Sequence, residues 1–211
     1  IKEDKNNYYA KIFSTKQITK LPKYLTPELT SFLGWFVSEG NVSKEAVCIC
    51  NNNKENQKEI KKLFKQFVEE NRITMYKDKV VVYSTILVKY LEEILGQKLG
   101  EKKCYTIKSP NMLTKASKEI ISSFIRSAFK GDGHIGKTKI EYSTKSKHLA
   151  EGISYMLTLL SIKYRFWQRK DKTYMITISG KKEINSFKNK VFKFKKEHKI
   201  RKEYNARYII P

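Results

Sequence analysis

Two short stretches of similar design constrain the fold more than any other feature of this 211-residue sequence. The first, FLGWFVSEGN, covers residues 32–41, and the second, SFIRSAFKGDGHIG, covers residues 123–136. In each, an apolar run with small residues ends in an acid followed by glycine. The two acids, Glu39 and Asp132, lie 93 positions apart. We interpret the chain as a tandem duplication that folds into two similar halves.

The same ungapped offset aligns residues outside the two stretches. It pairs Phe36 with Phe129, Ile60 with Ile153, Arg72 with Arg165, and Lys77–Lys79 with Lys170–Lys172. Each half then reads as αββαββα. We expect a helix capped by Thr26 from Pro27 to about Ser38, and a short strand after each acid-glycine pair. The other expected elements are strands at 46–51, 72–76, 80–84, 138–144, 164–168 and 173–179, and helices at 53–70, 85–95, 147–162 and 181–192.

The two acid-bearing helices each carry small residues at a spacing of four. Gly34 and Ser38 precede Glu39, and Ser127 and Gly131 precede Asp132. Residues at i and i+4 share one helix face, so each helix presents a stripe along which a second backbone can approach closely. If the halves pack about a pseudo-twofold axis, these helices cross at its centre and bring the two acids together.

Two adjacent carboxylates repel each other unless one is protonated or a cation lies between them. A hard divalent ion such as Mg²⁺ suits oxygen ligands, and carbonyls near Ser38 and Gly131 could complete its coordination. Metal ions at such a site can promote phosphodiester hydrolysis. The alternative is that Glu39 and Asp132 are polar residues at helix ends, before glycines that act as C-caps.

Charge indicates the class of partner. The sequence has 44 Lys and Arg against 21 Asp and Glu, a net charge of +23, while 40% of its residues are hydrophobic. A packed globule of this charge is typical of a nucleic-acid-binding protein. A lysine-rich surface inherited from an AT-rich genome is the alternative.

Three cysteines and three histidines, all poorly spaced, predict neither a disulfide framework nor a zinc site. We therefore expect a reducing compartment, either cytoplasm and nucleoid or an organelle matrix. No apolar run is long enough for a membrane span, and residues 1–11 lack the apolar core of a signal peptide, which predicts a protein that is not secreted.

The stretches FLGWFVSEG and IRSAFKGDG resemble the nonapeptide that names the LAGLIDADG homing endonucleases, and IEYSTKSKHLAEGISYMLTLLSIKYRF resembles the segment that follows the second motif. The resemblance covers about Leu25 to Phe194. It implies an α+β fold of tandem pseudo-twofold αββαββα repeats, with the motif helices at the centre and the β-sheets forming a DNA-binding saddle. The implied domains are an N-terminal basic segment (1–24), a first half (25–96), a linker (97–117), a second half (118–194) and a basic C-terminal tail (195–211).

The resemblance also implies roles for individual residues. The final acid of each motif binds the catalytic metal, here Glu39 and Asp132, and a basic residue before the second helix of a half completes the site. In the second half this is Lys145, with Lys147 close by. The first half departs from the pattern, because Asn52 matches Lys145 and Lys54 is the nearest lysine. Equal cutting of both strands is therefore in question.

Strand alternation predicts the surface that reads DNA. In residues 137–145, Ile140 and Tyr142 share the face toward the helices, and in the first half Val47 and Ile49 do the same. The opposite faces are free for a DNA groove. Cys48 and Cys50 either lie on that face or are ordinary buried strand residues. The expected DNA contacts are Lys44, Cys48, Cys50, Asn52, Lys54, Arg72, Thr74, Tyr76, Lys77, Lys79, Lys137, Lys139, Glu141, Ser143, Lys147, Arg165, Trp167, Arg169, Lys170 and Lys172.

These features predict a monomeric, Mg²⁺-dependent, site-specific endonuclease that makes a double-strand break in a long asymmetric DNA target, and the family usually leaves short 3′ overhangs. An RNA maturase that assists splicing of intron RNA and a non-catalytic DNA-binding regulator remain as alternatives. No Cys or Ser starts the chain and no His-Asn pair ends it. This favours a free-standing, intron-encoded enzyme or a domain excised from an intein.

Overall fold

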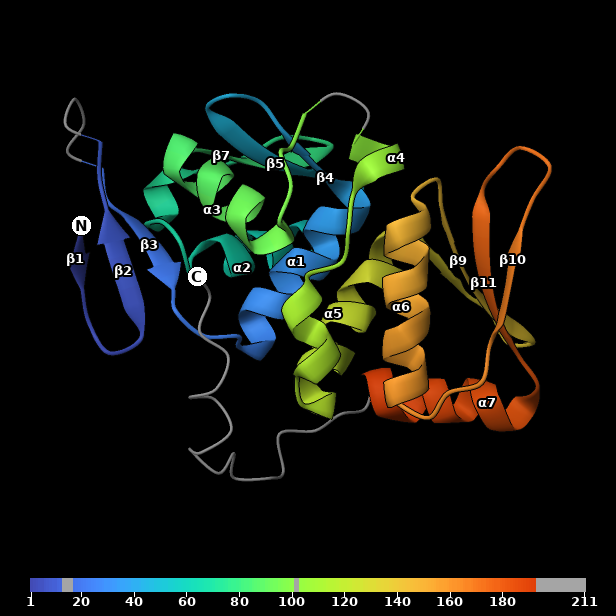
Figure 1. The fold of residues 1–211 in the computed structure, drawn as a ribbon. Coiled ribbons are helices and arrows are strands. Elements are labelled where there is room, and N and C mark those ends of the chain that lie inside the picture. Colours follow the sequence, from blue (N-terminus) through green and yellow to red (C-terminus); the bar gives the residue numbers. More distant parts are fainter. Residues whose placement is uncertain (13–16, 101–102, 193–211) are drawn as a thin grey trace.

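The computed structural model describes residues 1–12, 17–100 and 103–192, and the duplication is visible in its backbone (Figure 1). The first half has the order α-β-β-α-β-β-α. Its elements are α1 (Pro27–Glu39), β4 (Gly40–Val42), β5 (Ala46–Cys50), α2 (Lys54–Phe64), β6 (Ile73–Met75), β7 (Lys79–Tyr83) and α3 (Thr85–Leu95).

The second half repeats the same order. It comprises α5 (Lys118–Gly131), β8 (Gly133–Ile135), β9 (Lys139–Thr144), α6 (Lys147–Leu159), β10 (Arg165–Gln168), β11 (Tyr174–Ser179) and α7 (Lys181–Phe187), which continues as a π-helical turn at Lys188–Phe192. The predicted αββαββα repeat is therefore confirmed. The helix expected at 53–70 is shorter than predicted, because the chain turns after Phe64 to bury Phe67 and Val68.

Local capping explains where the motif helices begin. The Thr26 hydroxyl accepts a hydrogen bond from the Leu29 amide at 3.1 Å, and Pro27 occupies the first helical position, as predicted. Ser117 caps α5 in the same way, by accepting from the amide of Ile120. Side-chain caps therefore set the start of both helices.

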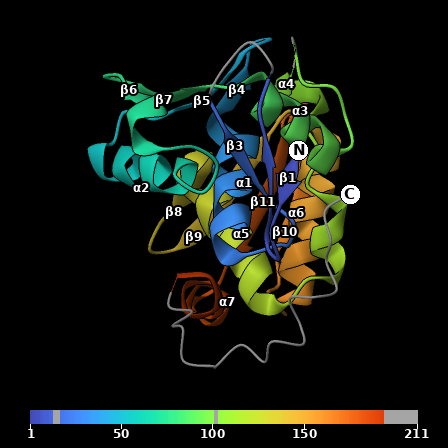
Figure 2. The ribbon, with the colours of Figure 1, turned by 90° about the vertical axis from the view of Figure 1, so that its left-hand side faces the viewer.

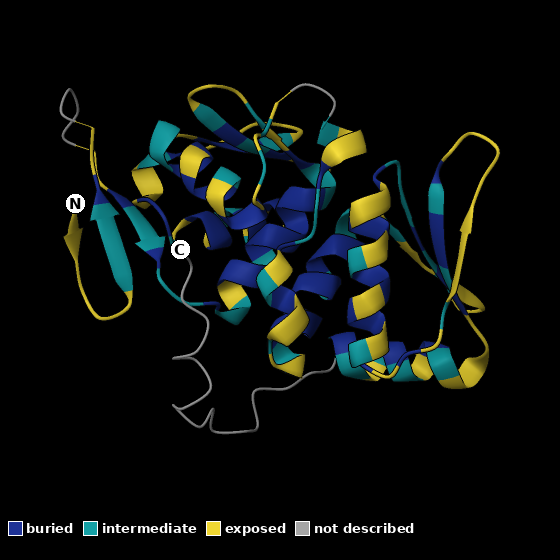
Figure 3. Cartoon of the chain, viewed as in Figure 1, coloured by how far each residue is buried: buried dark blue, intermediate teal, exposed yellow. Residues whose placement is uncertain are grey.

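Each half contains one antiparallel four-stranded sheet, with the orders β4-β5-β7-β6 and β8-β9-β11-β10. One face of each sheet packs on helices of its own half, and α1 and α5 lie side by side between the two sheets (Figure 1). Phe32 and Phe36 of α1 belong to the same hydrophobic core as Phe124 and Phe129 of α5, and all four are fully buried (Figure 3). The two halves therefore share one core.

Three parts lie outside the repeat. Within residues 1–24, expected as a basic segment, a three-stranded sheet consists of β1 (Lys2–Glu3), β2 (Asn7–Ala10) and β3 (Thr19–Pro22). The expected linker contains α4 (Lys103–Thr106) and a 3₁₀ helix at Asn111–Lys115. The predicted tail at 195–211 lies outside the described residues. Among those described, none of the helices has the length and apolarity needed to span a membrane.

Candidate active site and nucleic-acid interface

The site is built on the contact between α1 and α5. A Cβ on Gly34 would overlap the Phe124 carbonyl oxygen and lie 2.9 Å from the Cβ of Ser127. A Cβ on Gly131 would lie 2.6 Å from the Cβ of Ser38. Each glycine of one helix therefore faces a serine of the other, and the prediction that the small-residue stripes allow close approach is confirmed.

Hydrogen bonds fix how the two helices are aligned. The Ser38 hydroxyl donates to the Ala128 carbonyl at 3.1 Å and lies 3.0 Å from the Tyr142 hydroxyl. At the other end of the contact, the Thr30 hydroxyl donates to the Ile120 carbonyl at 3.2 Å. Because these bonds cross between the halves, they hold the two helices in a single register.

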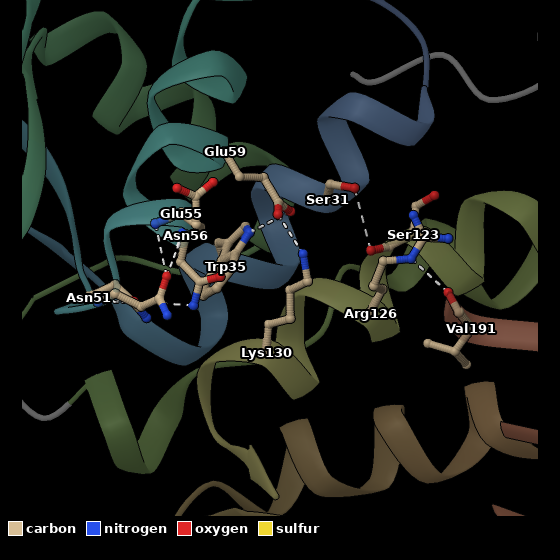
Figure 4. A network of polar contacts seen from close by, with 11 residues as sticks. Ser31, Trp35, Asn51, Glu55, Asn56, Glu59, Ser123, Arg126, Lys130 and Val191 are labelled. Carbon is tan, nitrogen blue, oxygen red and sulfur yellow. Dashed lines mark hydrogen bonds and ion pairs between the residues drawn. The ribbon is translucent and has the colours of Figure 1, made fainter. Parts of the chain in front are cut away.

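A polar network behind this contact also joins the halves (Figure 4). Glu59 of α2 accepts from the Trp35 indole at 3.2 Å and pairs with the Lys130 ammonium at 2.5 Å. Ser31 reaches the Ser123 carbonyl at 3.5 Å. Lys130 stands inside the second nonapeptide, and this ion pair gives it a role in joining the halves.

Glu39 is the last residue of α1, and Asp132 directly follows α5. A Cβ on Gly131 would lie 3.0 Å from Cγ of Glu39, so this side chain reaches the end of the opposite helix. Burial raises the pKa of Glu39, and the negative charge of Asp132 raises it further. The Asp132 side chain reaches solvent, yet the protein around it reduces its hydration and raises its pKa as well. The two acids are brought together, as the repeat predicted.

The glycines after the two acids lie where the backbone passes close to the preceding helix turn. Gly40 has φ −78° and ψ 150°, an extended conformation, and Gly133 begins β8. A Cβ on Gly40 would overlap the Phe36 carbonyl, and one on Gly133 would lie 2.5 Å from the Phe129 carbonyl. Gly40 is the C-cap of α1, as expected, and its amide donates to the Phe36 carbonyl, whereas Asp132 and not Gly133 caps α5. Close approach of the backbone requires glycine at both positions.

A lysine from the linker, which the sequence did not single out, lies beside the carboxylates. The half-buried Lys103 ammonium donates to the Phe36 carbonyl at 2.9 Å and to the Val37 carbonyl at 3.3 Å, in the last turn of α1. Burial lowers the pKa of Lys103 to about 8, although the charges of Asp132 and Glu39 oppose this shift. Its positive charge in turn lowers the pKa of both acids. Lys103 thus partly offsets the repulsion between them.

Lys145 shares a cavity with Asp132 and Lys103. This cavity has a volume of about 310 Å³, and Ser38 and Ser143 also line it. The Lys145 ammonium donates to the Asp171 carbonyl at 2.6 Å, which ties it to the turn between β10 and β11. The predicted basic residue of the second half therefore lies in the same cavity as the predicted metal ligand.

The first half provides a different lysine. Asn52, which matches Lys145, is exposed. Lys54, the first residue of α2, donates to the Lys77 carbonyl at 3.2 Å in the turn between β6 and β7. The buried side chain of Gln57 donates to the same carbonyl at 2.9 Å. Lys54 therefore binds its hairpin turn as Lys145 binds the turn of the second half.

The donor set suits a hard divalent cation. Within the described ranges, no three His, Cys, Asp or Glu side chains converge as a complete metal site. An ion held by Glu39 and Asp132 would take its remaining ligands from backbone carbonyls, water and phosphate. Mg²⁺ accepts such a set, because it binds one or two carboxylates and keeps several waters. Coordination by carbonyls near Ser38 and Gly131 stays a prediction.

Strand register places the second-half candidates on one face of the sheet. Glu141 pairs with Thr177, which also pairs with Arg165, and Ser143 pairs with Met175, which also pairs with Trp167. The opposite face holds Ile140 and Tyr142, both fully buried. The alternation predicted for this strand is confirmed. The remaining candidates are exposed around this face: Lys137, Lys139, Lys147, Arg169, Lys170 and Lys172.

The first-half sheet has a comparable open face. Val47 and Ile49 are fully buried, whereas Cys50 is exposed and Cys48 partly exposed. The two cysteines therefore lie on the face opposite the core, the first of the two placements considered. Lys44, Thr74, Tyr76 and Lys77 are exposed around this face, and Lys79 is partly exposed.

Arg72 does not occupy a strand position equivalent to Arg165, and that prediction is wrong. Arg72 ends a 3₁₀ helix at Glu70–Arg72, and its guanidinium donates to the Ile18 carbonyl at 2.7 Å and to the Tyr83 carbonyl at 3.2 Å. Because Ile18, which directly precedes β3, provides one of these acceptors, Arg72 is held in a structural role that Arg165 lacks.

Comparison with known sequences identifies a family profile and several proteins to which this chain is similar. A family profile described as a LAGLIDADG-like domain matches residues 119–191. Probable translation initiation factor IF-2 of Methanocaldococcus jannaschii is 31% identical over 87% of the chain, and a component of the A-type ATP synthase of Pyrococcus abyssi is 31% identical over 78%. The chain spans only 17% of the length of each of these two proteins.

Solved structures share the fold. A structure from a study of mesophilic variants of the homing endonuclease I-DmoI has a TM-score of 0.63 and 14% identity, and the match covers 80% of this chain and 97% of that one. The crystal structure of I-DmoI in complex with DNA and Mn has a TM-score of 0.59 and 15% identity, with 78% and 96% coverage. At this identity the likeness establishes the arrangement of elements.

Proposed function

Because the chain belongs to the LAGLIDADG homing endonuclease family, we propose that it is a site-specific endonuclease that hydrolyses both strands of a long asymmetric DNA target. The observation that carries this proposal is the meeting of Glu39 and Asp132 at one end of the α1–α5 contact. A purely structural contact would favour removing one of two acids that repel each other. A metal-binding site requires both.

The two carboxylates would hold the divalent cation, and Mg²⁺ fits their oxygen donors. When bound, the ion would lower the pKa of an attacking water and stabilise charge on the leaving oxygen. The I-DmoI complex with DNA and Mn supports this choice of cofactor and substrate. The contact between α1 and α5 fixes the positions of the two carboxylates.

Lys145 would act on the phosphate of the second half-site. Its ammonium is oriented by the bond to Asp171, and it lines the cavity beside Asp132. A fixed positive charge there stabilises the negative charge that develops on the phosphoryl oxygens. Lys54, tied to the hairpin turn of the first half, would serve the other strand.

The open faces of the two sheets would lie in the major groove, where lysine, arginine and glutamate side chains can contact base edges. Both motifs lie in one chain, so we propose that a monomer binds the whole target. The two open faces carry different side chains, cysteines in one half and charged residues in the other. The two half-sites should therefore differ in sequence.

The comparisons favour an intein-type segment over the intron-encoded alternative. An initiation factor and a component of an ATP synthase share no activity, yet one segment of each resembles this chain. A segment that recurs in proteins of unrelated activity is most simply an insertion. The target would then be the coding sequence that the insertion interrupts.

The test uses a duplex that joins the two coding sequences flanking the segment in its host gene. Wild-type protein with Mg²⁺ should cut both strands, and chelation of the metal should abolish cutting. Asp132→Asn should bind the duplex but not cut it. Glu93→Gln, which makes the same change of charge at an exposed position of α3, should cut normally.

Absence of metal-dependent cutting, or cutting by Asp132→Asn at the wild-type rate, would overturn the proposal. DNA binding without cutting would identify a non-catalytic regulator. Tighter binding to intron RNA than to the duplex, with stimulation of splicing, would identify an RNA maturase.

A further inference from the structure

The N-terminal sheet is a docked part of the protein that the duplicated fold does not need. The Lys20 amide of β3 donates to the Phe67 carbonyl at 2.7 Å, and the buried hydroxyls of Thr19 and Ser84 are 2.9 Å apart. The hydroxyl of Tyr90 in α3 donates to the Pro22 carbonyl at 2.6 Å. These bonds fix β3 against the outer end of the first half.

The two ends of this sheet differ in charge. At the turn between β1 and β2, Glu3 pairs with Lys23, and Asp4 accepts from the Tyr9 hydroxyl at 2.7 Å. At the other end, where β2 stops and β3 starts, Lys11, Ile12, Gln17 and Ile18 are exposed. Within the described chain Lys11 forms no ion pair. The acids of the sheet thus gather at one end, and an unpaired lysine lies at the other.

The Lys11 end adjoins the open face of the first-half sheet. A groove of about 270 Å³ is lined by Ile12, which follows β2, by Gln17, which precedes β3, by Glu45 from the turn between β4 and β5, and by Tyr83 at the end of β7. Tyr83 is 59% exposed and pairs with Ala46 on the open face. Figure 2 views the molecule from the side on which the N-terminal sheet lies, so that β1, β2 and β3 face the viewer.

Arg72 makes this junction rigid. Its guanidinium bonds to the Ile18 carbonyl on one side of the groove and to the Tyr83 carbonyl on the other. A duplex on the open face of the first half that continued past Tyr83 would therefore meet Lys11, Ile12, Gln17 and Ile18 in a fixed place.

We propose that these four residues contact the sugar–phosphate backbone of the duplex just beyond the first half-site. The inference rests on the proposed function and extends it to a longer, one-sided footprint. Charge complementarity supports it, because residues 1–24 contain six lysines against two acids. Backbone contacts fix position and add affinity without reading sequence, so this surface should lengthen the footprint and leave the preferred sequence unchanged.

The experiment compares Lys11→Glu with Lys5→Glu, which makes the same change of charge at an exposed position in the turn between β1 and β2, at the other end of the sheet. The probe is a labelled duplex selected by the wild-type chain from a random-sequence library in Ca²⁺. We expect Lys11→Glu to weaken binding about three- to tenfold and to reduce the salt slope by about 1, as expected for one lost phosphate contact. Lys5→Glu should change the affinity less than about twofold.

Truncation of the duplex locates the contact. Shortening one end, and only one, should weaken wild-type binding and remove the difference between wild type and Lys11→Glu. Lys11→Gln serves as a milder variant if Lys11→Glu unfolds in a thermal melt, and it should give a smaller loss at the same end.

Equal effects of the Lys11 and Lys5 variants, or a difference that persists whichever end is shortened, would overturn the inference while DNA binding stands. Failure of the wild-type chain to select any duplex would instead overturn the proposed function.

Discussion

Glu39 and Asp132 are acids whose ionised forms are both opposed by their surroundings. Reduced hydration raises the pKa of each above the ordinary value, and for Glu39 the charge of Asp132 adds to this. The folded protein therefore binds protons more tightly than the unfolded chain. Its free energy of unfolding should fall as the pH rises from the ordinary carboxylate range through the raised values.

Glu39→Gln removes one of these titrations. In chelating buffer the variant should be more stable than wild type at neutral pH, by about 1 kcal/mol or about 2–4 °C in melting temperature. The difference should shrink as the pH is lowered toward 4.5, the ordinary pKa of a glutamate. Thermal melts across this range measure it.

In the presence of Mg²⁺, wild type should become more stable than Glu39→Gln. An ion that binds only the folded wild type stabilises it by about 2.7 kcal/mol at about 100 times its Kd, and the variant should gain far less. Equal stabilisation of both proteins would contradict metal binding at Glu39.

The titration of Lys103 changes the free energy of unfolding in the opposite direction. Its pKa is lowered from 10.5 to about 8, so between these values the unfolded chain binds more protons than the folded one. The free energy of unfolding should therefore rise with pH in this window. In Lys103→Met this rise should be smaller by about 1–2 kcal/mol between about pH 8 and pH 9.5. Urea denaturation at the two pH values tests this, with Lys98→Met, an exposed lysine of the same linker, as the control.

The sequence could identify the two acids but not Lys103. The acids stand at equivalent places in a repeat, and the pairing itself is the signal. Lys103 is one lysine among many in a glycine- and lysine-rich linker, and its place depends on the path that the linker takes over the end of α1. Tertiary placement of this kind leaves no periodic pattern in the sequence.

At the scale of the elements, the α1–α5 contact depends on two glycines. Gly34 faces the backbone of α5, which cannot move aside as the end of a flexible side chain could. Gly34→Ala should destabilise the protein by about 1–3 kcal/mol through overpacking. Gly100→Ala, where a Cβ would meet nothing within 4 Å, should change stability by less than about 0.5 kcal/mol. Urea denaturation of the two variants and wild type measures both differences.

The effect of Gly34→Ala on DNA cutting should be separable from its effect on folding. Because Gly34 lies about one turn before Ser38 and Glu39, any shift of α1 relative to α5 also displaces a carboxylate. Gly34→Ala should lose cutting at temperatures where circular dichroism still reports a folded protein. Full activity in a folded Gly34→Ala variant would contradict the argument that this contact positions the acids.

Amphipathic helices and sheet faces were predictable because the periodicities of 3.6 and 2 are strong over helices such as α2 and strands such as β9. Helix α1 is buried almost all round and was predictable from its cap and its small residues instead. The N-terminal strands could not be predicted from the sequence. β2 and β3 are short, contain few β-branched residues, and are stabilised by bonds to Phe67, Ser84 and Tyr90, which lie far along the chain. Arg72 illustrates the same limit, since its acceptors include the carbonyl of Ile18, which directly precedes β3.

At the scale of the whole molecule, the two halves share a fold but differ in their active-site surroundings. Asp132 faces a cavity that contains Lys103 and Lys145, and the Lys145 position is occupied by Asn52 in the first half. There the bond to the hairpin turn comes from Lys54, which stands two positions later in the sequence. The two strands of a bound duplex would therefore meet unequal catalytic groups.

This inequality predicts strand-specific nicking. Lys145→Met should slow cleavage of one strand about tenfold or more, because a fixed charge near the phosphate is lost, and Lys54→Met should slow cleavage of the other. A linear target labelled at the end of one strand or the other would measure both rates, with the two variants accumulating DNA nicked in opposite strands. Lys182→Met, at an exposed position of α7, should leave both rates within about twofold.

If Lys145→Met slowed cleavage of both strands equally, the lysine would act through folding or through binding of the whole duplex. The proposal that each half serves one strand would then be wrong. Nicks in opposite strands would instead show that the duplication has produced two separate catalytic centres around one shared pair of acids.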